Sequence, residues 1–246
     1  MANPLPPSLH DKTIPLDISP EGARRLLVGL SWEPLLEPKL TTEEKKSLWA
    51  RLALTWKLMP GNRGGYTGYA AKHQREWRKD EDKSSREKDY PHYDLDLLCL
   101  VFDNDKNLQV TIGPDPDILI DDLSTIYHSG ENSTGSGGIA DDEQIHIETA
   151  SVPDSYQHFF FIVLSDCKFD LGEIDSLKIR IADSKTEKNF LTLDIMPPEH
   201  TALKTGYLFA HIFRDGDNWK ALPIEQFDAF EADWPALCAS LIPTKR

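Results

Sequence analysis

The apolar residues of this chain fall into short runs that are separated by turn-forming residues. The clearest run is Tyr93–Phe102, which alternates polar and apolar residues and then becomes continuously apolar, as expected of a β-strand. Many short strands at fairly even spacing favour two packed sheets over a chain of alternating strands and helices. The expected strands are Leu16–Ile18, Arg25–Trp32, Tyr93–Phe102, Leu108–Ile112, Gln144–Glu148, His158–Leu164, Leu177–Ile181, Phe190–Ile195 and Gly206–Arg214.

Only a few short helices are expected among these strands. The candidates are Ile118–Ser124, Gly172–Ser176 and Ile224–Trp234. In the last of these, aromatic residues recur at spacings of three and four, which is typical of the buried face of a helix. The predicted fold is therefore mainly β, a two-sheet β-sandwich with a few short helices and a partly helical insertion.

Acidic side chains are concentrated between Asp94 and Asp154, where Lys106 is the only lysine or arginine. Within this region the glycine-rich segment Gly130–Glu143 ends in three consecutive carboxylates. Two like charges about 4 Å apart repel by roughly 1 kcal/mol in water and by about 4 kcal/mol at a surface-like dielectric. The segment is therefore either a solvated acidic loop or a cation site. Its oxygen donors favour calcium, which accepts irregular cages of carboxylate, amide and backbone oxygens.

Other acidic pairs in the sequence have simpler interpretations. Asp94 and Asp96 share one face of the predicted strand, because side chains repeat every two residues, and they need a partner there. The segment Asp103–Asn107 imitates the start of a calcium-binding EF-hand loop but lacks its glycine and distant glutamate, so we expect a turn. The segment Asp215–Asn218 contains Asp-Gly between two strands, which predicts a hairpin turn.

Several motifs, taken together, carry a family resemblance. They are Leu27–Trp32, Tyr93–Leu97, Gly130–Gly135, Asp141–Gln144, Phe159–Val163, Gly206–Arg214 and Asn218–Lys220. In these motifs the chain resembles the TerD family of tellurium-resistance and stress-response proteins. The resemblance implies a compact β-sandwich in the bacterial cytoplasm that binds calcium. It also implies a non-enzymatic role in the response to tellurite and related stresses, including phage and colicin attack.

The resemblance further implies where calcium binds. The family pattern places ligands at the paired aspartates, at the Gly-Asp-Asn stretch and at the Asp-Asp-Glu triplet. The corresponding residues here are Asp94, Asp96, Glu131, Asn132, Asp141, Asp142 and Glu143. The chain departs from the family at Glu131, where aspartate is usual, and at 135–140, which lacks the usual acid and is one residue longer. Because family members resemble two-calcium binders, we expect one or two Ca²⁺ ions.

Composition limits which binding partners and which cellular compartment are expected. A net charge of −14 argues against nucleic acid, whose phosphates it repels. No stretch approaches the roughly 20 apolar residues of a membrane span, and Met1–Lys12 lacks the apolar core of a signal peptide. Three scattered cysteines suit a reducing compartment, and Cys99 and Cys167 are expected in the core. We therefore expect a cytoplasmic protein that neither spans a membrane nor binds nucleic acid.

The domain prediction assigns residues 1–32 and 90–235 to the sandwich, 33–89 to a helical, charged insertion and 236–246 to a C-terminal tail. The insertion is expected to start with a capped helix, and its tryptophans Trp49, Trp56 and Trp77 would suit a protein interface. Its run of mixed charges is more typical of a solvated helix or a mobile loop than of a docking surface.

Two alternatives to a calcium-binding stress protein follow. One is an adaptor or scaffold that uses the insertion to bind other proteins of a tellurium-resistance or phage-defence complex. The other is a metal-dependent hydrolase that uses His128 or His146 with the acids. The hydrolase is the weakest of the three hypotheses, because the sequence contains no recognisable nucleophile and base.

Overall fold

The structure is a computed structural model, and it describes residues 13–18, 24–34, 94–129, 141–165, 170–195 and 204–243. The chain divides into two compact units, Met1–Pro34 with His92–Arg246 and Leu35–Pro91. The second unit lies outside the described residues, so the predicted helix after Thr41 and the three tryptophans of the insertion lie there too.

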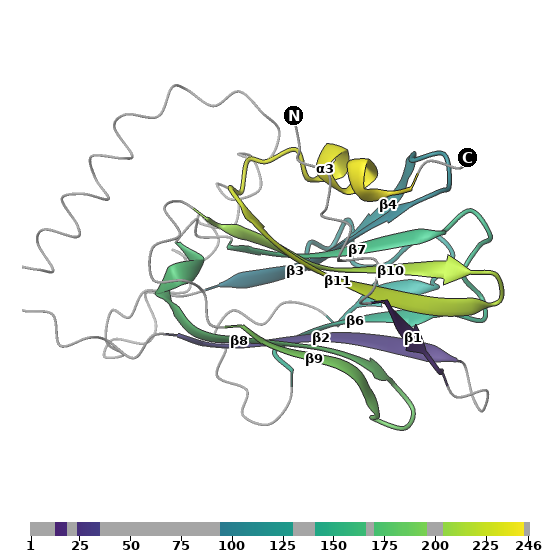
Figure 1. Cartoon of the computed structure of the whole chain (residues 1–246), viewed down its shortest axis with the longest axis horizontal. Helices are drawn as coiled ribbons and strands as arrows, with labels where there is room; N and C mark the ends of the chain where they lie inside the picture. Colours follow the sequence, from purple (N-terminus) through teal and green to yellow (C-terminus); the bar gives the residue numbers. More distant parts are fainter. Residues whose placement is uncertain are drawn as a thin grey trace, which may run out of the picture. The chain divides into compact units, whose positions relative to one another are not determined.

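The described residues form two antiparallel sheets that pack face to face (Figure 1). Sheet A has six strands in the order β1-β11-β10-β7-β3-β4, and sheet B has five in the order β5-β6-β2-β8-β9. The strands are β1 Ile14–Leu16, β2 Arg25–Pro34, β3 Leu95–Phe102, β4 Leu108–Ile112, β5 Ile126–His128, β6 Glu143–Glu148, β7 His158–Ser165, β8 Ile174–Asp183, β9 Asn189–Ile195, β10 Gly206–Asp215 and β11 Asn218–Asp228. The predicted two-sheet β-sandwich is confirmed.

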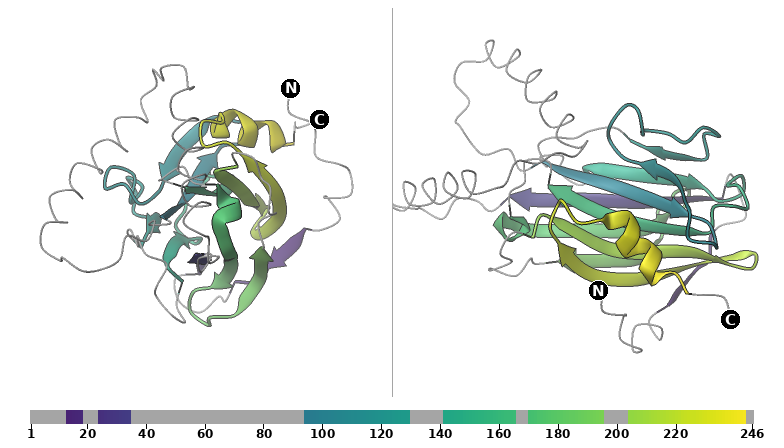
Figure 2. Two further views of the ribbon diagram at one scale, coloured as in Figure 1. Left: turned by 90° about the vertical axis from the view of Figure 1, so that its left-hand side faces the viewer. Right: turned by 90° about the horizontal axis from the view of Figure 1, so that it is seen from above.

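Successive side chains of a strand point to opposite faces of its sheet, and in sheet A both faces carry apolar layers. In β3, Leu95 and Leu97 belong to the core between the sheets, whereas Leu98 and Leu100 belong to a second cluster on the outer face of sheet A. Helix α3 (Trp234–Leu241) covers that outer face, as Figure 2 also shows from above. Because sheet A is covered on both faces, every residue of β7 is buried.

The predicted helix Ile224–Trp234 is wrong. Residues 218–228 form β11, and the helix begins only at Trp234, where the side chain of Asp233 accepts the N–H of Ala236. The aromatic spacing was misleading because Phe227 stacks on Tyr207 of the neighbouring strand, with ring centroids 4.2 Å apart. Residues 236–241, which were predicted as part of a tail, continue α3, and Cys238 is buried in the outer cluster.

Two other predicted helices also differ from the structure. The segment Ile118–Ser124 forms turns around an isolated bridge instead of a helix. Of the segment Gly172–Ser176, only its first residues lie in a helix, the single 3-10 turn Leu171–Glu173, and β8 begins at Ile174. The short strand β5 was not predicted.

Both predicted turns are confirmed. The side chain of Asp103 accepts the backbone N–H groups of Asp105 and Asn107 at 2.8 and 2.9 Å, and these bonds close the β3–β4 turn. Asp215 pairs with Asn218 across a two-residue hairpin in which Gly216 has φ +64°. No helix in the described residues is long and apolar enough to cross a membrane.

Candidate functional site

Five of the predicted ligands lie within the described residues, at or next to the starts of two strands: Asp94, Asp96, Asp141, Asp142 and Glu143. Strands β3 and β6 begin at one end of the sandwich, and β2 finishes there, because β2 and β6 run antiparallel. The chain therefore enters β3 from Asp94 and enters β6 from Asp141 and Asp142 at the same end. Glu131 and Asn132 precede β6 but lie outside the described residues.

Glu143 connects the two sheets. It is the first residue of β6, its side chain is fully buried, and its Oε2 accepts the backbone N–H of Leu97 in β3 at 2.6 Å. Strand β4 pairs with β3 only from Cys99 onward, so within the described part of the chain this stretch of the β3 edge has no strand neighbour on the β4 side. The carboxylate of Glu143 supplies the acceptor that a strand would otherwise supply.

Asp142 does the same for strand β2. Its N–H donates to the carbonyl of Leu30 at 2.7 Å, and its Oδ2 accepts the N–H of Trp32 at 3.3 Å. Because β6 begins at Glu143, the β2 residues beyond Leu30 have no partner in β6. The Asp142 side chain, only 9% exposed, therefore caps β2 at the same end.

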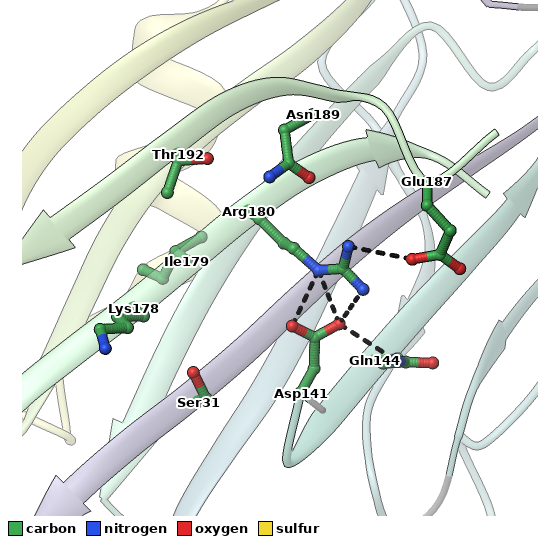
Figure 3. A pocket seen from close by; sticks show the side chains of 9 residues that line it. All are labelled: Ser31, Asp141, Gln144, Lys178, Ile179, Arg180, Glu187, Asn189 and Thr192. Carbon is green, nitrogen blue, oxygen red and sulfur yellow. Dashed lines mark hydrogen bonds and ion pairs between the residues drawn. The ribbon is translucent and has the colours of Figure 1, made fainter. Parts of the chain in front are cut away.

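Asp141 is held by a cation from the protein. Its carboxylate oxygens both accept from Nε of Arg180 at 2.9 Å, and Oδ2 lies 2.8 Å from Nη2 (Figure 3). The side chain of Gln144 also donates to Oδ2, at 3.0 Å. The hydrogen bond to Asp141 is the largest cause that raises the pKa of Arg180. The three consecutive acids therefore have three different environments.

The paired aspartates lie on the other sheet. Asp94 immediately precedes β3 and is 6% exposed, and Asp96 is the second residue of the strand and partly buried. By alternation Asp96 shares the outer face of sheet A with Leu98, whereas Glu143 contacts β3 from the side of sheet B. Among the described residues, no three or more histidine, cysteine, aspartate or glutamate side chains form a group that could hold a metal ion.

The two histidines considered for catalysis lie on opposite faces of sheet B. His128 is buried, with Nε2 3.3 Å from Oε2 of Glu143, and burial lowers its pKa to about 4. His146 stacks on Tyr127 and lies 3.1 Å from the Gln144 amide oxygen, on the outer face. They share no site, and the side chain of His128 has no exposed surface through which to meet a substrate.

A polar cavity of about 620 Å³ lies beside the Asp141–Arg180 pair. Figure 3 shows Lys178 and Arg180 on β8 along its floor, with Asn189 and Thr192 above them. Glu187, which is 70% exposed, accepts from Nη1 of Arg180 at 3.3 Å. The lining thus contains two basic residues and two acids, and both acids, Asp141 and Glu187, pair with Arg180.

Sequence reasoning missed Arg180 and the two capped strands. Arg180 lies 39 positions from Asp141, and only the sheet register brings them together. The two backbone N–H groups that the acids accept belong to Leu97 and Trp32, and both residues lie in predicted strands. That these N–H groups lack a partner in β4 or β6 follows only from where those neighbouring strands begin and end. Finding these positions requires the order of the strands in the sheets, which the sequence does not provide.

Comparison with known proteins gives one family and five matching chains of solved structures, of which two are given below. A family model described as TerD domain matches residues 76–240, beginning within the predicted insertion and leaving β2 outside. No curated protein matches the sequence. A homologue of telluride resistance protein (TerD) from Streptomyces coelicolor A3(2) is 16% identical, with a TM-score of 0.48 over 87% of this chain and 94% of that one. A protein of unknown function named SAV2460 is 14% identical, with a TM-score of 0.49 over 90% of this chain and 98% of that one.

Proposed function

Because the chain belongs to the TerD domain family, we propose that it is a calcium-binding, non-enzymatic protein of the tellurium-resistance and stress response. The observation that carries this proposal is the bond between Glu143 and the N–H of Leu97. It ties the acids at the start of β6 to β3, which contains Asp96 and directly follows Asp94. This bond supports a site to which carboxylates from both sheets contribute at one end of the fold.

The donor set fits calcium in its chemistry. Asp94, Asp96 and Asp142 supply only oxygen, the donor that calcium prefers, and a carboxylate offers about four lone-pair positions, more than one N–H bond uses. Glu143 has one oxygen bonded to the N–H of Leu97. Glu131 and Asn132 would complete the shell from the preceding segment. A bound ion would supply positive charge among these acids and cross-link the ends of the two sheets.

The burial of the donors favours an ion over a solvated acidic surface. Asp94 and Asp142 are less than one-tenth exposed, and Glu143 is not exposed at all. A buried carboxylate is stable only when hydrogen bonds or positive charge compensate for its lost hydration. A solvated acidic loop would instead expose its carboxylates to water.

Calcium titration tests the proposal directly. Calorimetry of the full chain with Ca²⁺ should show binding heat, and Mg²⁺ serves as the control because it demands a near-octahedral shell. Free calcium at 100 times the dissociation constant should stabilise the fold by about 2.7 kcal/mol, which raises the melting temperature. Absence of both heat and a thermal shift at millimolar calcium would overturn the proposal.

A role in docking other stress-response proteins remains a prediction for residues 33–89. That segment lies almost wholly outside the described residues, so no described contact supports it.

A further inference from the structure

The carboxylate of Asp141 lies in a slot on the outer face of sheet B. In the sheet register Gly29 of β2 is opposite Arg180 of β8 on one side and Gln144 of β6 on the other. A Cβ atom added at Gly29 would lie 2.3 Å from the carboxyl carbon of Asp141. The bare backbone of Gly29 therefore forms the floor of the slot, and any larger residue there would displace the carboxylate.

The walls of the slot provide the hydrogen-bond donors. Arg180 presents Nε and Nη2 to the two carboxylate oxygens, and Gln144 donates from the opposite side (Figure 3). The Asp141 side chain is 10% exposed and that of Arg180 is 23% exposed. Such a side-on contact between guanidinium and carboxylate is a strong, charge-assisted pair with a defined geometry.

This pairing conflicts with a ligand role for Asp141. A calcium ion bound to the same two oxygens would stand close to the Arg180 guanidinium, and like charges repel. The positive charge that the acid needs is already supplied by β8. The contacts of Asp142 and Glu143 are of another kind, since these carboxylates accept the backbone N–H groups of Trp32 and Leu97.

We propose that the Asp-Asp-Glu triplet is divided in function: Asp141 is an anchor, and Arg180 is a positioning residue that holds it over Gly29. The anchor fixes the point at which the chain enters β6, and so sets where Asp142 and Glu143 stand relative to β2 and β3. The inference rests on the proposed function, because it assigns roles within the same calcium site.

A double-mutant cycle tests this division. The variants are Asp141→Asn, Arg180→Gln and the double substitution, measured by calorimetry with Ca²⁺ and by melting in EGTA. If Asp141 acts only through Arg180, each single variant should weaken calcium binding about tenfold, the usual loss for a partner that orients metal ligands. The double variant should then be no worse than either single one, because one interaction is lost in all three.

Filling the slot provides an independent variant without any change of charge. Gly29→Ala should displace the carboxylate and reproduce the affinity loss of Asp141→Asn. Ser31→Ala, two residues along the same face of β2, is the matched control and should bind calcium like the parent. Arg180→Lys keeps the positive charge but cannot donate two parallel hydrogen bonds to Asp141. Its calcium affinity should therefore lie between those of Arg180→Gln and the parent.

The outcomes distinguish an anchor role of Asp141 from a role as a calcium ligand. If Asp141→Asn weakens binding by the same factor with and without Arg180, Asp141 is a calcium ligand and the inference is overturned. Normal affinity in Gly29→Ala would also overturn it. If the parent protein itself gives no calcium heat, the proposed function fails. In that case melting in EGTA still shows whether Asp141 and Arg180 are coupled.

Discussion

The side chain of Glu143 reaches from one sheet of the sandwich to the other, where its Oε2 accepts the backbone N–H of Leu97 at 2.6 Å. Glu143 is fully buried and also lies 3.3 Å from Nε2 of His128. A carboxylate that was expected to bind an ion is therefore also part of the hydrogen bonding of the core. Its contribution to stability can be measured without metal.

Replacing Glu143 by alanine should lower the free energy of unfolding by about 1–3 kcal/mol in EGTA, because the buried N–H of Leu97 loses its acceptor. Glu143→Gln keeps an acceptor oxygen and should lose less. Urea unfolding followed by circular dichroism provides the measurement. An equal loss in both variants would show that the charge of Glu143, and not its acceptor role, stabilises the fold.

Asp142→Asn should weaken calcium binding by at least about tenfold, the loss that even outer partners of metal ligands cause. The amide keeps an oxygen for the N–H of Trp32, so melting in EGTA should change little. Calorimetry measures the affinity. Asp122→Asn, at an exposed acid in the β4–β5 connection, is the control. An unchanged affinity in Asp142→Asn would place the ion elsewhere.

Stability should fall as the pH is lowered below about 6.5, the pKa of an unfolded histidine. His211 is buried, its Nε2 lies 3.0 Å from Nδ1 of His158, and burial together with His158 lowers its pKa well below that value. Between the two pKa values the unfolded chain binds a proton that the native chain does not, so acid favours unfolding. The slope is at most about 1.4 kcal/mol per pH unit for each such group.

The variant His211→Gln isolates this contribution. It removes one titrating group, so its free energy of unfolding should fall less steeply between pH 6.5 and pH 5 than that of the parent. His128 and His146, whose pKa values are also lowered, remain and leave a residual slope in the variant. Identical slopes in the two proteins would show that His211 does not contribute.

Gly206→Ala should destabilise the contact between β10 and α3. A Cβ atom at Gly206 would lie 2.4 Å from Cζ2 of the buried Trp234 ring, and overpacking of this kind costs about 1–3 kcal/mol. Thermal unfolding measures the loss. At Gly113 the atom nearest to an added Cβ is the flexible tip of Ile118, at 3.0 Å, and Leu98 follows at an ordinary contact distance of 3.4 Å, so Gly113→Ala should cost less. If the two variants lose the same stability, the Trp234 contact is not the cause.

The strands could be predicted where their pattern was local. Leu108–Ile112 forms β4 within the predicted bounds, and β7 extends the predicted strand only to Ser165. Strand β11 was missed because the spacing of Phe227, Phe230 and Trp234 imitates a helix. That spacing arises instead from contacts with Tyr207 and with the outer cluster, which depend on tertiary structure.

The candidate site was predictable in its composition but not in its contacts. The acidic region around Asp94 and Asp142 stands out by its charge density, and the family resemblance assigns these carboxylates as ligands. Their partners could not be found in the same way, because Arg180 and Gly29 meet Asp141 only through the register of three strands. The sequence around the acids contains no nearby cation, and the fold supplies one from a distant strand.

The β10–β11 hairpin lies at the far end of the sandwich, because β10 begins at Gly206 beside the end of β7 and finishes at Asp215. Its tip, Gly216 and Asp217, protrudes from the strand pairing (Figure 1). A fluorophore or affinity handle grafted onto this tip would report on the protein from a whole strand length away. Titrations of the opposite end could then be followed with a label that leaves the acids untouched.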